Sequence, residues 1–522
     1  MSIKIRNTTK ESRFSNDKVY MVVTVLVSLY ITWAVYFSLF NTYKFLWVAL
    51  LIWVVSFLLL NQLFFLMERW SYLVEEPRTI SSIQAFRSCF LIILVGQIIY
   101  WLAYYPGGFN LDALGQWDQA HGLAQLNNWH PILTTAFYWL VTRIADSLAL
   151  CIFTQILFFS FSLARLLTDL YNAGISIRII TLIAVAAAVN PAIGLNNACL
   201  FKDVPFTIAI IWAYIFLIKL YLSNGEWLKN PRNVCLMTID CLVMILIRHN
   251  GIFFAFPVFI VLMIAYKKQI KSVLVSFILL CSCIVLVEGP IFKYLNVTQH
   301  NNVIGEAVGV PMGIMANALV NDSENIPEEV RSFLYDIADN SSWVDNYIVG
   351  EWDSCKWEFG GGDLFVDESL GRFLDLTIKT IQACPDTSYK AIKENTRVVW
   401  QIWGYGKWMP YVYVEENEYG IVENYNNFCN GLVNVIIKIC NTDLVATFIW
   451  NVGSMVLIIL VLLLNSIKFR EYRKMVLIIP MMVYNLLTMC LLCGPNFRYF
   501  YFNSVIFLPI AVLMLKRDKC LV

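Results

Sequence analysis

Four short polar clusters interrupt an otherwise apolar sequence, at residues 104–131, 196–203, 248–250 and 494–499. A carboxylate can remove a proton from a hydroxyl group, and Lys or Arg can stabilise the negative charge on a departing phosphate. Arg also offers a planar fork that matches phosphate oxygens. The candidate side chains are Asp112, Gln116, Asp118, His130, Lys202, Asp203, Arg248, His249, Arg498 and Tyr499. Together they predict a site that receives an anionic group.

Each cluster also has a simpler structural interpretation. Asp112 follows a Pro-Gly-Gly turn, where Asp or Asn commonly caps a helix. Lys202 and Asp203 fit an ordinary ion pair at a helix start. In the same simpler interpretation, the side chains of Arg248 and Arg498 snorkel to the membrane interface. Snorkelling does not predict that cations from three separate loops should each lie within a polar and aromatic cluster, so a shared binding site is favoured.

The composition indicates where such a site would lie. Of the 522 residues, 59% are hydrophobic and only 14% are charged, which is more apolar surface than a water-soluble domain of this length can bury. A soluble enzyme is therefore excluded. The net charge of +1 gives no electrostatic basis for binding nucleic acid. The 14 cysteines have no repeated CxxC spacing and no ligand-like spacing to the four histidines, so no metal, cofactor or disulfide framework is predicted.

The apolar segments predict an all-α polytopic membrane protein with about twelve transmembrane helices, since a bilayer core about 30 Å thick requires roughly 20 apolar residues per helix. The candidate spans are 19–40, 45–67, 86–105, 148–167, 177–195, 204–222, 233–247, 251–266, 272–289, 443–466, 475–493 and 501–515. The two halves of 233–266 are weak candidates because each has only about 15 apolar residues. The amphipathic segment 131–145 fits a position along the membrane surface.

The distribution of Lys and Arg predicts the orientation. Alternating sides from a cytoplasmic N-terminus places 23 of these residues in inside segments and only five in the short outside loops. Because positive residues favour the cytoplasmic side, both termini are predicted to be cytoplasmic. All four polar clusters then fall on the outer face of the cell membrane.

The polar segment 290–442 is long enough to form a domain outside the membrane. Its pattern is mainly helical, for example at Pro327-Glu328, where Pro followed by Glu is typical of a helix start. The chain is therefore predicted to comprise an N-terminal transmembrane module (1–289) with a catalytic outer loop at 106–147, an extracytoplasmic insertion (290–442) and C-terminal transmembrane helices (443–522).

Several motifs resemble a group of bacterial multi-pass membrane proteins related to GT-C-type glycosyltransferases. The motifs are Tyr105-Pro106-Gly107, Asn110-Leu111-Asp112, Gln116, Asn128-Trp129-His130-Pro131, Phe201-Lys202-Asp203-Val204-Pro205-Phe206, Arg248-His249-Asn250-Gly251 and Arg498-Tyr499. The resemblance covers roughly residues 86–290 and 443–515, and more loosely the insertion.

This resemblance implies a GT-C-like helical bundle, a polyprenyl-phosphate sugar as donor and inversion at the anomeric carbon. It implies that Asp112 is the general base and that Lys202, Arg248 and Arg498 bind the phosphate. The chain has Leu111-Asp112 where some GT-C members have two adjacent carboxylates, so a metal-independent mechanism is predicted.

The sequence therefore predicts a glycosyltransferase that moves a sugar from a polyprenyl-phosphate donor in the lipid bilayer to a cell-envelope glycan, lipid or protein acceptor. A transporter or flippase would also use cations, but it would place ionisable residues near mid-membrane and show related halves. An envelope polysaccharide polymerase or ligase with a lipid-pyrophosphate donor is a chemically related alternative. A non-enzymatic assembly protein would use 290–442 to bind partners.

Overall fold

The computed structural model describes residues 10–40, 46–298, 305, 307–361, 364–365, 368–402 and 410–517. Within these residues every regular element is a helix, and extended segments pair only through isolated bridges. The prediction of an all-α protein is confirmed.

The helical bundle contains most of the apolar helices. Its first half comprises α1 (Lys10–Leu39), α2 (Leu46–Val74), α3 (Ser82–Ala103), α4 (Leu111–His121), α5 (Ile132–Thr142), α6 (Leu148–Asn172), α7 (Ile177–Val189), α8 (Pro191–Asn197) and α9 (Asp203–Leu222). Its second half comprises α10 (Pro231–Ile247), α11 (Ile252–Ala265), α12 (Ile270–Leu286), α13 (Phe292–Tyr294), α21 (Asn427–Cys440), α22 (Asp443–Ile449), α23 (Val452–Lys468), α24 (Met475–Met489) and α25 (Phe502–Leu515). Short 3₁₀ segments include η1 (Glu226–Lys229) and η7 (Phe497–Phe500).

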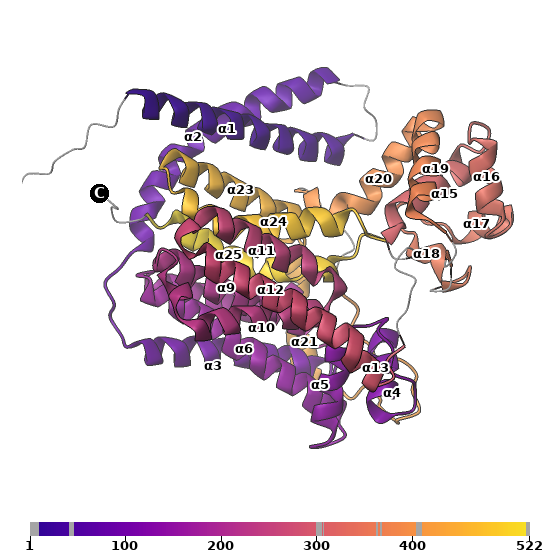
Figure 1. The fold of residues 1–522 in the computed structure, drawn as a ribbon, viewed down its shortest axis with the longest axis horizontal. Helices are drawn as coiled ribbons and strands as arrows, with labels where there is room; N and C mark the ends of the chain where they lie inside the picture. The colour runs from indigo at the N-terminus through magenta and orange to yellow at the C-terminus, as the bar shows by residue number, and fades with distance from the viewer. Residues whose placement is uncertain are drawn as a thin grey trace, which may run out of the picture.

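Helix α9 lies at the centre of the bundle. It contacts α6, α8, α10, α24 and α25, and most of its side chains are buried. A helix that is apolar on all sides is stable only where neighbours cover all sides, which explains this central position. In Figure 1, α1 and α2 lie along one side of the bundle and α3 along the opposite side. The start of α1 and the end of α25 lie at one end, whereas α4 and the insertion lie at the other.

Among the residues that the structure describes, seven helices are long and apolar enough to cross a bilayer, or up to nine if each of two bent helix pairs forms one span. These helices make the chain a membrane protein. The count is lower than the twelve predicted, because several apolar runs fold into short helices: α11 has 14 residues, α24 has 15, and α10 and α23 have 17 each. Residues 1–9, 518–522 and Lys44, which entered the orientation prediction, lie outside the described residues.

Two predicted spans are interrupted. The run 177–195 is divided at Pro191, where α7 and α8 meet at 58°. The run 443–466 is divided between α22 and α23, and α22 pairs with α21 across a bend of 102° instead. Hydropathy averaged over a window does not detect such breaks, because the flanking residues are apolar on both sides. The 11-residue helix α5 is too short to cross a bilayer.

The insertion forms its own apolar core. Its helices are α15 (Gly309–Asn321), α16 (Glu328–Tyr335), α17 (Asn340–Asn346), α18 (Asp353–Lys356), α19 (Leu370–Ala383) and α20 (Pro385–Trp400). The core contains stacked Trp343 and Trp352, with ring centroids 5.9 Å apart, and Phe365 packed edge-on against Phe373. Helix α20 leads back to the bundle and packs against α23 and α24. The segments that follow it return to α3 through α21.

Candidate functional site

Six of the predicted residues form one continuous row of contacts, and they come from five separate parts of the chain. Asp112 lies in the first turn of α4, and His130 lies just before α5. Lys202 and Asp203 begin α9, Arg248 follows α10, and Arg498 lies in η7. We name the six the charged row: Asp112, His130, Lys202, Asp203, Arg248 and Arg498.

The buried part of the charged row is centred on Asp203. Its side chain is only 2% exposed, and it forms an ion pair with Arg248, which is 4% exposed. On the other side, Arg498 Nε lies 3.4 Å from Asp203 Oδ2. One carboxylate therefore holds two guanidinium groups in place. Asp203 therefore pairs with two arginines that are distant in the sequence, and Arg248 is buried in an ion pair instead of snorkelling to the membrane interface.

The accessible part is centred on Asp112, whose side chain is 36% exposed. Arg498 Nη1 lies 3.2 Å from Asp112 Oδ2, and His130 Nε2 lies 3.6 Å from Oδ1. Lys202 Nζ in turn lies 2.7 Å from His130 Nδ1. Asp112 does not cap α4, because Asn110 does so by accepting a hydrogen bond from the backbone N–H of Ala113. Its carboxylate is therefore available to the site.

The neighbouring charges determine the protonation states of the accessible residues. Burial by itself would raise the pKa of Asp112, but Arg498, Lys202 and His130 together lower it below its usual range. Burial, followed by the charge of Lys202, lowers the pKa of His130 to about 3. At neutral pH, Asp112 is therefore ionised and His130 is neutral. The charged row then contains three cations and two carboxylates, and this excess positive charge favours an anionic ligand.

Aromatic rings and an amide hold the two arginines. The guanidinium of Arg248 lies over the Tyr499 ring, 4.4 Å from its centroid, and that of Arg498 lies 5.2 Å from the Phe201 centroid. Arg248 Nε donates to Asn250 Oδ1 at 3.0 Å, and Asn250 donates to the Tyr484 hydroxyl. Tyr484 donates to the backbone carbonyl of Tyr499 at 3.1 Å. These contacts fix both guanidinium groups before any ligand arrives.

A backbone clamp places the start of α4 beside the start of α9. Gly108 donates to the carbonyl of Ala198 at 2.8 Å, and Leu200 donates back to the Gly108 carbonyl. The next residue, Phe109, is bonded in the same way to residues 413 and 415. A Cβ at Gly108 would lie 2.5 Å from the sulfur of Cys199, so this close approach requires glycine. The clamp brings the Asp112 carboxylate within reach of the cations of the charged row.

Residues 117–520 match a known family, and these residues include all of the charged row except Asp112. The chain belongs to DUF6020, a family of unknown function. In this DUF6020 chain, Asp112 lies five residues before the matched region. No curated protein and no solved structure matches the chain.

The other four predicted residues have different positions around the charged row. Gln116 is buried in α4 and donates to Thr135 Oγ1 at 3.2 Å. Asp118 accepts a hydrogen bond from Tyr419 at 2.6 Å. His249 lies 3.0 Å from the backbone carbonyl of Asn128, and Tyr499 packs under Arg248. Gln116, Asp118 and His249 therefore hold the loops together in this structure. The described part of the DUF6020 chain contains no group of three or more His, Cys, Asp or Glu side chains that could hold a metal ion.

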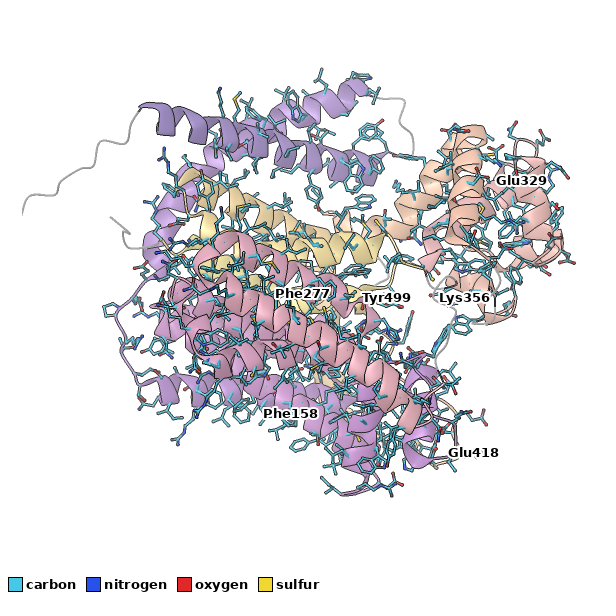
Figure 2. All side chains as sticks on the ribbon, viewed as in Figure 1. Phe158, Phe277, Glu329, Lys356, Glu418 and Tyr499 are labelled. Atoms are coloured by element: carbon cyan, nitrogen blue, oxygen red, sulfur yellow. The ribbon has the colours of Figure 1, made fainter. Side chains whose placement is uncertain are left out.

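The insertion contacts the loop that precedes His130. Buried Lys356 lies over the rings of Trp129 and Trp357, at 5.5 Å and 4.6 Å from their centroids. Asp353 also donates its backbone N–H to the Cys493 carbonyl, in the loop that leads to Arg498. In Figure 2, Tyr499 lies at the end of the bundle nearest the insertion, whose near edge carries Lys356. No sequence pattern indicates these contacts, because Trp and Lys occur throughout the chain.

A second feature that sequence reasoning missed is an apolar cavity of about 560 Å³ between α6, α9 and α10, with contributions from α5 and η1. One ionisable carboxyl lines it, that of Asp240, and its Oδ2 has no hydrogen-bond partner among the described residues. Asp240 is an ionisable residue inside the short predicted span 233–247. Its partner elements could not be identified, because the cavity is formed by helices far apart in the chain.

Proposed function

We propose that this chain is a membrane glycosyltransferase, with a GT-C-like bundle and cytoplasmic termini, that transfers a sugar from a polyprenyl-phosphate donor to a cell-envelope acceptor at the outer face of the cytoplasmic membrane. The observation that carries the proposal is the contact between an accessible carboxylate, Asp112, and the Arg498 guanidinium, with Lys202 next after His130 on the other side of Asp112. A base and two phosphate-binding cations thus lie within one ligand's reach.

In the proposed reaction, Arg498 and Lys202 bind the phosphate of the donor. Asp112 accepts the proton of the acceptor hydroxyl, whose oxygen attacks the anomeric carbon. The bond between that carbon and the phosphate oxygen breaks, and the leaving polyprenyl phosphate takes the bonding electron pair. Attack from the face opposite to the leaving phosphate inverts the anomeric configuration. The cations stabilise the charge that develops on the phosphate.

The resting ion pair gives the base a natural means of activation. While Arg498 pairs with Asp112, the carboxylate is ionised but weakly basic, because its pKa is held low. A bound phosphate competes for Arg498, and the loss of that partner raises the pKa of Asp112 toward its usual value. The base therefore becomes stronger when the donor is in place. Asp203 is a positioning residue, since it touches the arginines and is too buried to meet substrate.

The test uses purified full-length protein in lipid nanodiscs with radiolabelled polyprenyl-phosphate sugars and an envelope extract as acceptor. Asp112→Asn should abolish transfer, because it removes the base while preserving shape. Asp118→Asn is a matched control, since Asp118 lies in the same helix but contacts Tyr419 instead of the charged row. Equal transfer by wild-type protein and the Asp112→Asn variant would contradict the assignment of the base.

A transporter or flippase for a lipid-linked substrate is the second candidate, and the cavity favours it. An ionisable residue such as Asp240 within an apolar cavity is typical of substrate or proton pathways in membranes. The same donor reconstituted in liposomes separates the two functions. A glycosyltransferase breaks the sugar–phosphate bond, whereas a transporter moves the intact donor across the bilayer.

A further inference from the structure

The apolar cavity is lined by one continuous stripe on each of two facing helices. On α9 the lining residues recur every three or four positions, as expected for one helical face; they are Pro205, Ile208, Ala209, Trp212, Phe216 and Lys219. On α10 they are Asn233, Leu236, Ile239, Asp240, Val243 and Ile247. The two ends of each stripe are 14 positions apart in the sequence, which corresponds to about 20 Å along a helix axis. The cavity is therefore elongated along the two helices.

One end of the cavity adjoins the charged row. Lys202 lies three residues before Pro205, so it continues the lining stripe of α9. Ile247, the last lining residue of α10, directly precedes Arg248. Gln155, which also lines the cavity, donates to the carbonyl of Cys199 at 2.9 Å in the segment that leads to Lys202. The apolar cavity thus ends beside an excess of positive charge.

We propose that this cavity holds the hydrocarbon chain of a single-chain lipid phosphate, with the phosphate at Lys202 and Arg498. The volume lies within the range of roughly 300 to 1000 Å³ that accommodates one elongated small ligand, which favours one chain over the two chains of a diacyl phospholipid. The cationic end matches a phosphate and not a neutral alcohol. Because the proposed donor is a polyprenyl-phosphate sugar, the single-chain lipid phosphate is assigned as a polyprenyl phosphate. The inference rests on the proposed function for the phosphate position, and it adds the path of the lipid chain.

Two ionisable residues in the cavity wall, Lys219 and Asp240, would lie beside the bound lipid chain. Lys219 at the far end lies 3.7 Å from Asp169, which also pairs with Arg165, so its charge is balanced by the protein. Asp240 lies at mid-cavity, where a carboxyl group has no favourable interaction with hydrocarbon. Replacing it with an apolar residue should strengthen retention of the lipid chain. A transport pathway that uses Asp240 would instead lose function with the same change.

The experiment uses full-length protein in nanodiscs and a polyprenyl phosphate that carries a photoreactive group in its chain. Cross-linked peptides should come from α9 and α10. Ala209→Trp, which fills the cavity from α9, should reduce cross-linking about tenfold, the effect of roughly 1.4 kcal/mol. Val243→Trp provides a second obstruction from the opposite wall. Leu182→Trp is the control, since Leu182 is 67% exposed on α7 and does not line the cavity.

Competition identifies the chemistry of the occupant. Unlabelled polyprenyl phosphate should displace the probe, while polyprenol and phosphatidylglycerol should not. Lys202→Ala should make polyprenyl phosphate and polyprenol equally weak competitors. Asp240→Leu should retain or increase cross-linking. Equal displacement by phosphatidylglycerol, or unchanged cross-linking to α9 and α10 in both tryptophan variants, would overturn the inference.

The inference and the proposed function fail separately. If the probe labels α9 and α10 but no sugar is transferred, the lipid site stands and the glycosyltransferase proposal fails. If sugar is transferred while Ala209→Trp and Val243→Trp proteins work as well as wild-type protein, the enzyme stands and the lipid chain lies elsewhere. Retention of the wild-type elution volume in detergent shows that a variant is folded.

Discussion

The buried ion pair between Asp203 and Arg248 should be essential to the stability of the bundle. Both side chains are almost fully buried, at 2% and 4% exposure, and Asp203 also contacts Arg498. Asp203→Asn keeps the shape of the side chain but removes its charge. Because an uncompensated guanidinium then remains buried, we expect the free energy of unfolding to fall by about 3 to 5 kcal/mol.

The measurement is reversible unfolding in detergent micelles, with the double variant Asp203→Leu/Arg248→Met as a companion. Removing both charges leaves no buried ion without a partner, so the double variant should recover much of the lost stability. Asp375→Asn is a control of the same type, because Asp375 pairs with Lys379 at 2.7 Å on the exposed surface of α19. Its unfolding midpoint should barely change, since exposed pairs contribute little.

Two results would refute this reasoning. A stability of the Asp203→Asn variant within about 1 kcal/mol of wild type would mean that the buried arginine is not left uncompensated. A double variant less stable than either single variant would mean that the pair acts through packing and not through charge. Loss of transfer without loss of stability in the Asp203→Asn variant would still fit a positioning role, because Asp203 orients Arg498.

Three further outcomes follow from the charged row and its clamp. The pKa of His130 is lowered to about 3 in the folded protein, so the unfolded chain binds more protons between pH 6.5 and pH 3. The free energy of unfolding should therefore be unaffected by His130 above pH 6.5 and should fall as the pH is lowered toward 3. His130→Gln should weaken this pH dependence. Because Arg498 lowers the pKa of Asp112, Arg498→Gln should move the acidic limb of the pH profile of any residual transfer toward higher pH, measured as kcat/KM. Gly108→Ala should destabilise the protein by about 1 to 3 kcal/mol in thermal unfolding, whereas Gly115→Ala in open space within α4 should stabilise it by roughly 0.5 to 1 kcal/mol.

Much of the fold could be predicted from the sequence, because the hydrophobic effect acts on composition and local pattern. The apolar runs, the all-helical class and the polar insertion all appear in the residue types. The number of spans could not be predicted in this way. The break at Pro191 and the bend between α21 and α22 depend on packing against other helices, and an average over 18 residues does not record them.

The candidate site was predictable in its residue types but not in its pairs. Clusters of Asp, Lys and Arg in separate loops indicated an anionic ligand. The pairing of carboxylates with cations depends on the clamp at Gly108 and on the packing of α9 against α10. Both are contacts between residues far apart in the sequence. The cavity was not predictable at all, since its two stripes are ordinary apolar helix faces.

The two carboxylates of the charged row show how burial separates roles that the sequence leaves equivalent. Asp112 and Asp203 each lie in the first turn of a helix, and each contacts Arg498. Asp203 is nearly inaccessible and shared by two arginines, so it can only orient them. Asp112 is 36% exposed, so it can meet a hydroxyl group. Because Arg498 bridges the two, a phosphate that draws it from Asp112 leaves Asp203 as its remaining carboxylate partner, and the released Asp112 is the one acid of the charged row able to accept a proton.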